Sequence, residues 1–204
     1  MNLFLVRHGE TAHNRDGVGF GRTDVPLTEL GERQADATGR RLAKSGIELA
    51  ITSPLSRAKE TARAIASCSG IELQEYEGLI ELDVGETEGL PLTLVREKYP
   101  DFISSWIGAD GFKPNFPGGE SLLDVRERAA AILAEAEGME VQNLAIVSHN
   151  FVLRMILCDL IGIPPSQFRR FSVDLASVSV LARDQGRTFV RTFNDCCHLA
   201  NLDS

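Results

Sequence analysis

The chain has 204 residues, of which 43% are hydrophobic, 25% charged and 6% aromatic. These proportions exclude a disordered, collagen-like or coiled-coil protein, and the length fits a single domain over residues 1–204 with a sizeable core. The 21 lysine and arginine residues against 29 aspartate and glutamate residues give a net charge of −8. This balance argues against nucleic acid as a partner, because a phosphate backbone is bound by a broad basic surface.

Strand and helix patterns alternate in the first half of the chain. In chain order they are a buried strand at Asn2–Val6, a glycine-rich loop at 8–26, a helix from its cap Thr28 to about Ser45, a strand at Ile47–Thr52, a helix over 53–69 and a strand at Ile71–Tyr76. The helix over 53–69 is predicted to begin with Ser53 as its N-cap and Pro54 as its first residue. A loop with three glycines follows at 77–92.

The second half continues the alternation. In chain order it holds a weak helical pattern at 93–107, a glycine- and proline-rich loop at 108–119, a helix that opens with a capping box of Ser121 and Asp124, a strand at Leu144–Ser148, an apolar helix at 151–160, and two strands, Ser177–Arg183 and Thr188–Phe193, joined by a turn at 184–187. The alternation predicts an α/β protein with three layers, α/β/α, around a mainly parallel sheet.

Cysteine usage and hydropathy restrict the class of protein further. The four cysteines form neither a C-x-x-C pair nor a cluster with histidine, so we expect no disulfide framework and no metal site. The N-terminal apolar run is too short for a signal peptide, and the longest apolar stretch, 151–163, is interrupted by Arg154 and Asp159. We therefore expect a cytoplasmic protein without a membrane partner.

Several residues suited to phosphate chemistry fall where strands end or helices begin. A neutral imidazole such as that of His8 is a nucleophile, and the adjacent Arg7 would hold a phosphate and disfavour protonation of the ring. Arg57 lies in the first turn of a predicted helix, whose free N–H groups attract anions; Glu81 could donate a proton to a leaving alkoxide; and His149 ends another strand. Because ligands of α/β sheets bind at the carboxyl ends of the strands, these residues are expected to share one site.

Six motifs support this interpretation and occur over essentially the whole chain. They are Arg7-His8-Gly9-Glu10-Thr11 with Asn14, the run from Gly21 to Ala35, Ser53-Pro54-Leu55-x-Arg57-Ala58, Glu81-x-x-x-Gly85, Pro117-Gly118-Gly119-Glu120-Ser121 and Ser148-His149. Together, and in this order, they resemble the histidine phosphatase superfamily, in the branch that contains the cofactor-dependent phosphoglycerate mutases. Two positions depart from the family pattern: Thr87 stands where an aromatic residue is frequent, and Asn150 where a glycine commonly follows the second histidine.

The resemblance implies a phosphoglycerate mutase-like fold and a role for each matching position. His8 would be the nucleophile that becomes phosphohistidine, and Glu81 the general acid. The positions expected to bind the phosphoryl group are Arg7, Asn14, Gly21, Arg57, His149 and Asn150. No metal and no other cofactor are expected, because two arginines and a second histidine can neutralise the phosphoryl charge without Mg²⁺.

The leading interpretation is a metal-independent phosphomonoesterase that passes the phosphoryl group of a small phosphorylated metabolite to His8 and then to water. A phosphoglycerate mutase is the alternative, but mutases of the family carry a longer insertion with an Arg-Tyr-Gly motif, whereas 86–116 has only three cations, Arg96, Lys98 and Lys113. A non-catalytic phosphate-binding module is a third hypothesis, disfavoured because every catalytic position is filled.

The substrate stays open at this point and includes sugar phosphates, phosphoserine, phosphoglycerates, nucleotide monophosphates and ribazole phosphate. We expect selectivity to reside in residues 106–116, where Trp106, Phe112 and Phe116, with Lys113, either form a lid or anchor the loop to the core. An exposed terminal strand could support a homodimer.

Overall fold

A six-stranded sheet forms the centre of the computed structural model, which describes residues 1–202. The strands are β1 (Asn2–Arg7), β2 (Leu49–Thr52), β3 (Glu72–Glu75), β4 (Asn143–Ser148), β5 (Val178–Asp184) and β6 (Arg187–Asp195). Their order across the sheet is β3-β2-β4-β1-β5-β6. The pairs from β3 to β1 are parallel, and β5 and β6 add an antiparallel edge. The predicted mainly parallel sheet is confirmed.

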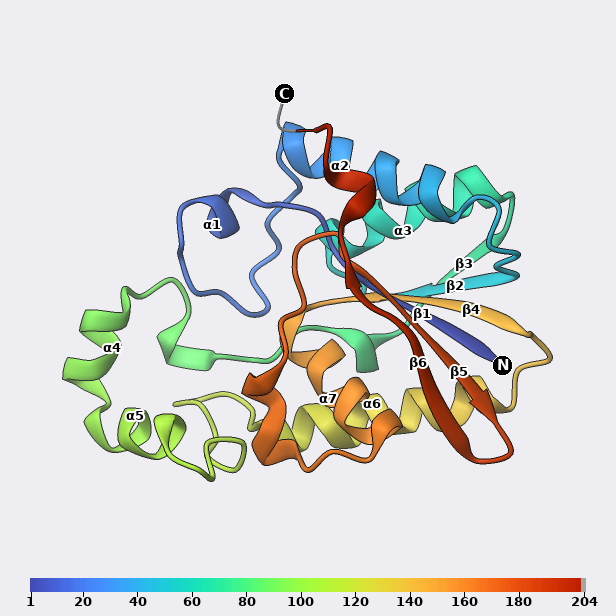
Figure 1. The fold of residues 1–204 in the computed structure, drawn as a ribbon. Coiled ribbons are helices and arrows are strands. Elements are labelled where there is room, and N and C mark those ends of the chain that lie inside the picture. The colour runs from blue at the N-terminus through green and yellow to red at the C-terminus, as the bar shows by residue number, and fades with distance from the viewer. Residues whose placement is uncertain (203–204) are drawn as a thin grey trace.

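Helices cover both faces of the sheet, which confirms the three layers (Figure 1). On one face lie α2 (Glu29–Leu42) and α3 (Ser56–Ser69), and on the other α6 (Leu122–Glu137) and α7 (Asn150–Ile161). Three shorter helices, α1 (Ala12–Arg15), α4 (Leu92–Lys98) and α5 (Pro100–Ile107), lie beyond the carboxyl ends of the parallel strands. No helix among residues 1–202 has the length and hydropathy needed to cross a membrane.

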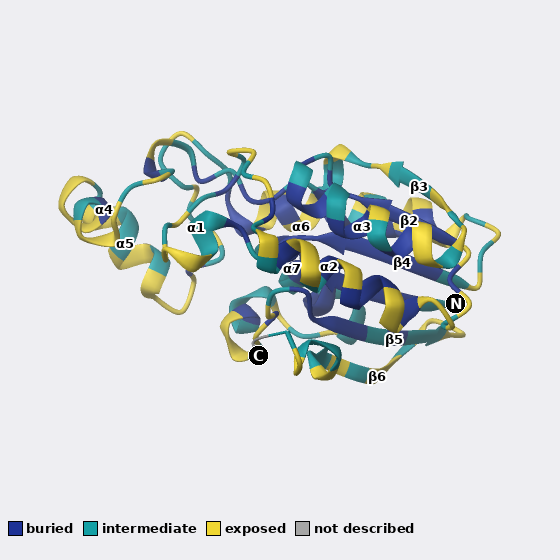
Figure 2. Ribbon diagram, turned by 90° about the horizontal axis from the view of Figure 1, so that it is seen from above, coloured by how far each residue is buried: buried dark blue, intermediate teal, exposed yellow. Residues whose placement is uncertain are grey.

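Successive side chains along the buried strands point to opposite faces of the sheet, so the core has two halves, one on each face. Leu3 and Leu5 of β1 pack on the side of α6 and α7, whereas Phe4 and Val6 face α2 and α3. Strands β1 and β4 are buried through most of their length (Figure 2). Runs of consecutive apolar residues in these strands follow from having helices on both faces.

The start of α3 differs from the prediction that Ser53 is its N-cap. The helix begins at Ser56, whose backbone N–H donates to Asp24 Oδ1 at 2.8 Å. Ser53 instead accepts the N–H of Leu55 in the turn before the helix. The first N–H group of α3 therefore already has a carboxylate partner and is not free for phosphate.

Two other predicted segments need correction. The helix expected over 93–107 is two helices, because Pro100 has no N–H to continue the first one and instead begins α5. Helix α1, with four residues, is too short to show a helical period and was expected to be loop. By contrast, the capping box of Ser121 and Asp124 at the start of α6 is confirmed.

Candidate active site

The pairing of β1 with β4 brings the two predicted histidines together. Arg7 lies opposite Ser148 in the parallel register, and the backbone N–H of His8 donates to the carbonyl oxygen of Ser148 at 3.1 Å. The imidazole rings of His8 and His149 consequently lie with their centroids 5.1 Å apart. Residues separated by more than half of the chain thus share the carboxyl edge of the sheet.

His8 is held as a neutral imidazole with a defined tautomer. Its Nδ1 lies 2.7 Å from the carbonyl oxygen of Gly9, and because a carbonyl only accepts hydrogen bonds, Nδ1 carries the proton and Nε2 keeps its lone pair. Burial lowers the pKa of His8 well below its ordinary value of 6.5, and the charges of Arg7 and Arg57 lower it further. The ring is therefore unprotonated at neutral pH, which is the state in which an imidazole nitrogen can act as a nucleophile.

The loop after His8 is fixed by close packing against α2. A Cβ atom on Gly9 would lie 2.5 Å from the carbonyl oxygen of Gly31, so only glycine permits this approach. The N–H of Gly9 donates to Oγ1 of Thr61 on α3 at 3.1 Å. These contacts leave little freedom in the backbone that positions the His8 ring.

Arg57 is completely buried and makes three directed hydrogen bonds. Its Nη2 donates to the carbonyl oxygen of Gly21 at 2.7 Å, its Nη1 to that of Thr23 at 2.9 Å, and its Nε to Nδ1 of His149 at 3.3 Å. The Phe20 ring lies 4.7 Å from its guanidinium carbon, a cation–π contact. Burial lowers the pKa of Arg57, and these contacts fix its guanidinium beside His149.

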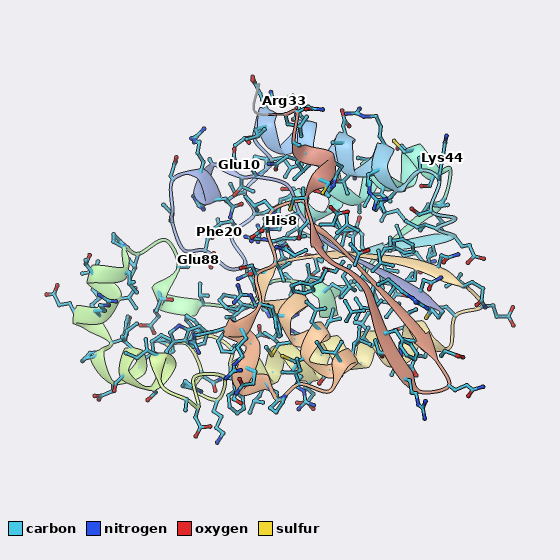
Figure 3. The ribbon with its side chains drawn as sticks, viewed as in Figure 1. His8, Glu10, Phe20, Arg33, Lys44 and Glu88 are labelled. Carbon is cyan, nitrogen blue, oxygen red and sulfur yellow. The ribbon has the colours of Figure 1, made fainter. Side chains whose placement is uncertain are left out.

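The loop that receives Arg57 is in turn held by Glu88. Oε1 of Glu88 accepts the N–H groups of Gly21 and Thr23 at 2.9 and 2.8 Å. A Cβ atom on Gly21 would lie 2.2 Å from the carbonyl oxygen of Leu82, so this position accepts only glycine. Figure 3 shows Phe20 and Glu88 close to His8, although they belong to different loops.

Both ring nitrogens of His149 are engaged by protein groups. Nδ1 accepts the hydrogen bond from Arg57, so the proton resides on Nε2, which donates to Oγ of Ser53 at 2.7 Å. Burial and the charge of Arg57 lower the pKa of His149 well below 6.5. His149 could bind a phosphoryl oxygen directly only if one of these two hydrogen bonds broke and the new contact replaced it.

Arg7 offers a donor that the protein itself does not satisfy. Its Nη1 donates to the carbonyl oxygen of Val173 at 2.7 Å, whereas its Nε is buried and has no partner within residues 1–202. Buried donors are almost always paired, so this one is suited to a bound anion. Burial lowers the pKa of Arg7 to about 10, and the group remains charged at neutral pH.

Glu81 lies at the amino end of α7. Its Oε1 accepts the N–H of Leu82 at 2.8 Å and its Oε2 that of Phe151 at 3.3 Å, and the side chain is buried. These bonds fix the carboxyl group and leave lone pairs on both oxygens, since a carboxylate oxygen accepts more than one hydrogen bond.

The two predicted asparagines occupy less central positions. Oδ1 of Asn14 accepts the backbone N–H and the hydroxyl of Thr11, which makes Asn14 part of the capping box of α1. Only its amide NH₂ group remains for a ligand. Asn150 is the first residue of α7 and half-buried.

Arg7, His8, Arg57, Glu81 and His149 are called the cluster below. Four residues near the cluster were not predicted as site residues from the sequence, although Ser53 belongs to one of the quoted motifs: Phe20, Ser53, Glu88 and Arg154. Arg154 lies on α7, its charge interacts with Glu81, and its Nε is buried without a partner within residues 1–202. A charge in the middle of an otherwise apolar helix was the signal for Arg154. Phe20, Ser53 and Glu88 act through contacts between distant segments, for which no local pattern exists.

The aromatic residues expected to control selectivity divide into two groups. Trp106 and Phe116 line a cavity next to the cluster, with their ring centroids 4.7 Å apart. Phe112 packs against the core without lining that cavity, and Lys113 pairs with Asp110 at 3.1 Å. The loop thus serves both as a wall of the cavity and as an anchor to the core.

The site and fold match a known family over nearly the whole chain. The profile of the histidine phosphatase superfamily (branch 1) matches residues 3–196. Phosphoserine phosphatase 1 of Hydrogenobacter thermophilus is 34% identical, over 99% of this chain and 96% of its own length. A probable phosphoglycerate mutase, GpmB, of Yersinia enterocolitica is also 34% identical, over 88% of this chain and 83% of its own.

A solved structure extends the match to three dimensions. The crystal structure of a putative alpha-ribazole-5'-P phosphatase from Escherichia coli superposes with a TM-score of 0.88 at 30% identity, over 96% of both chains. The chain therefore belongs to the histidine phosphatase superfamily, branch 1, and has its phosphoglycerate mutase-like α/β fold. Proteins similar to it are named for both phosphatase and mutase reactions on small phosphorylated compounds.

Proposed function

We propose that this protein is a metal-independent phosphomonoesterase, which hydrolyses a small phosphorylated metabolite through a phosphohistidine at His8. The observation that carries the proposal is the neutral His8 ring, whose Nδ1–H is bound to Gly9, beside the buried and unpaired Nε of Arg7. A nucleophilic lone pair and an unsatisfied cationic donor in one buried place are suited to a phosphoryl group.

The proposed reaction has two steps. In the first, Nε2 of His8 attacks phosphorus, the bond between phosphorus and the ester oxygen breaks, and Glu81 transfers a proton to the departing oxygen. In the second, Glu81 takes a proton from a water molecule that attacks the phosphohistidine, which releases inorganic phosphate and restores His8.

The positive charge for both steps comes from side chains. Arg7 would bind a phosphoryl oxygen through its unpaired Nε, and Arg57 and His149 would form the opposite wall. We assign supporting contacts to the Asn14 amide and to Asn150, and to Gly21 the role of holding Arg57 through its carbonyl oxygen. Preorganised cations of this kind stabilise the charge on the transferring group.

Hydrolysis is favoured over phosphoglycerate mutase chemistry by the cavity that adjoins the cluster. A mutase must retain a bisphosphate while it reorients, which requires a second anion-binding set. Of the described residues that line this cavity, the only charged one is the acidic Asp16. A bisphosphate intermediate would therefore find no second clamp there, and water is the better acceptor.

The experiment that tests the proposal is the trapping of a phosphoryl-enzyme. Wild-type protein mixed with para-nitrophenyl phosphate and quenched without acid should carry an acid-labile, alkali-stable phosphoryl group at His8, and His8→Ala should lose turnover. His198→Ala is the matched control, since His198 follows β6 and its Nε2 contacts Oγ1 of Thr38 on α2 rather than a residue of the cluster. Full turnover in His8→Ala, or a phosphoryl group on His149, would overturn the proposal.

A further inference from the structure

A cavity of about 550 Å³ adjoins the catalytic cluster, between residues 16–20 and the helices α4 and α5. This volume lies within the range of about 300 to 1,000 Å³ that is usual for small-molecule sites. Its walls are mainly apolar and include five aromatic side chains, those of Phe20, Phe102, Trp106, Phe116 and Phe151.

Two of these aromatic residues connect the cavity to the catalytic groups. The Phe20 ring lies against the guanidinium of Arg57, and the backbone N–H of Phe151 donates to Oε2 of Glu81. An ester whose phosphorus lies at His8 and whose bridging oxygen lies at Glu81 would thus extend its alcohol between these two residues. The cavity is therefore the binding place of the leaving group.

The charged residues that line the cavity bear on which alcohols it can bind. Asp16 is the only charged residue among the described ones that line the cavity, and it is exposed and paired with Arg15 at 2.9 Å. Arg169 reaches the wall from outside, but it donates to the carbonyl oxygen of Trp106 at 2.6 Å and stacks on the indole ring. Arg154 on α7 interacts with Glu81 but is not among the residues that line the cavity. A carboxylate on an alcohol bound in the cavity would therefore lose water without gaining a cationic partner from the described wall, which is costly.

We infer that, given the proposed phosphatase activity, the preferred substrate is a phosphate ester of an uncharged and largely apolar alcohol, with an aromatic or similarly bulky hydrocarbon part against Phe20 and Trp106. Aromatic rings in offset or edge-to-face contact with these side chains bury apolar surface and complement their geometry. Esters with a carboxylate near the phosphate, such as phosphoserine and the phosphoglycerates, are poor substrates on this inference.

A matched pair of esters tests the inference. We choose 2-naphthyl phosphate and 4-carboxyphenyl phosphate, because their phenols are of similar acidity and the two esters differ mainly in charge and apolar area. The expected kcat/KM is at least about tenfold higher for the naphthyl ester, since the carboxylate is desolvated without a partner. Equal values, or a preference for the carboxylate, would overturn the inference.

A charge placed on the wall provides a second measurement. Leu92 lines the cavity and is 57% exposed, so Leu92→Lys should fold and should shift the ratio of kcat/KM toward the 4-carboxyphenyl ester. Leu123→Lys is the matched control, because Leu123 is exposed on α6 and does not line the cavity. An unchanged ratio in Leu92→Lys would contradict binding of the alcohol in this cavity.

Phenyl phosphate separates this inference from the proposed function. If phenyl phosphate is hydrolysed through His8 and the naphthyl ester has no advantage, the assignment of the cavity is wrong and the phosphatase remains. If no ester is hydrolysed through His8, the proposed function fails and the inference fails with it.

Discussion

Nε of Arg57 donates a hydrogen bond to Nδ1 of His149 over 3.3 Å, although the two residues lie 92 positions apart in the chain. The bond requires Nδ1 to be unprotonated, so it assigns the His149 proton to Nε2, where Ser53 accepts it. The hydrogen bond thereby satisfies one donor of the charged Arg57, and the charge of Arg57 in turn favours the neutral form of His149.

The two clustered histidines should remain neutral through the physiological pH range. Burial and the nearby arginines lower the pKa of His8 and of His149 well below 6.5, so protonation occurs only as the pH falls well below that value. In ¹⁵N NMR spectra of histidine-labelled protein, both rings should keep one neutral tautomer from pH 8 to below pH 6.5, with the proton on Nδ1 of His8 and on Nε2 of His149.

His8→Asn and His149→Asn variants assign the two NMR signals, and urea-unfolded protein provides the control, because both rings should then titrate near the ordinary value. A titration of His8 near 6.5 in the folded protein would contradict the prediction. The loss of His8 nucleophilicity with falling pH should accordingly begin well below 6.5.

Arg57→Lys should reduce kcat/KM strongly. A lysine carries the charge but cannot donate in three fixed directions to Gly21, Thr23 and His149. We expect a loss on the order of 100-fold, similar to the removal of a preorganised donor in other active sites. Arg63→Lys is the control, because Arg63 is exposed on the same helix; equal effects of the two changes would show that the geometry of Arg57 is unimportant.

Glu81→Gln should affect esters according to the basicity of their leaving groups. An alkoxide needs the proton that Glu81 supplies, whereas para-nitrophenolate departs without it, so the first step should slow by roughly 100- to 10,000-fold for alkyl esters and much less for the nitrophenyl ester. Single-turnover measurements isolate that step. Glu127→Gln on the exposed side of α6 is the matched control, and equal losses for both esters would give Glu81 another role.

Removal of metal ions should leave the activity intact. Arg7 and Arg57 supply positive charge in the proposed catalytic cluster, and within residues 1–202 no group of three or more histidine, cysteine, aspartate or glutamate residues is placed to hold an ion. Turnover after dialysis against EDTA should equal that of untreated protein. A need for added Mg²⁺ or Mn²⁺ would show that side-chain cations do not suffice.

Trp106 and Phe112 should respond differently to replacement by alanine. Trp106 lines the cavity, so Trp106→Ala should change the relative kcat/KM of naphthyl and phenyl phosphate. Phe112 packs on the core without lining the cavity, so Phe112→Ala should lower the melting temperature by several degrees and leave that relative kcat/KM unchanged. The reverse result would exchange the roles of the two side chains.

Local patterns in the sequence predicted most of the fold. Consecutive apolar residues identified β1 and β4 because both strands are buried on two faces, and the box of Ser121 and Asp124 located the start of α6 because capping is completed within four residues. The predicted cap of α3 failed because a distant residue intervened. Ser53 did not cap α3, since the N–H of Ser56 donates to Asp24 and the Ser53 hydroxyl oxygen accepts a hydrogen bond from Nε2 of His149.

The sequence by itself determined the order of strands and helices and the chemical types available at the strand ends, since both depend on neighbours within a few positions. Only the tertiary structure decided that His8 and His149 lie side by side, that Glu88 holds the loop that binds Arg57, and that aromatic residues of four separate segments enclose one cavity. The physical reason is that hydrogen bonds and packing act through space over a few ångströms, whereas the partners here lie tens of residues apart and meet only when the sheet has formed.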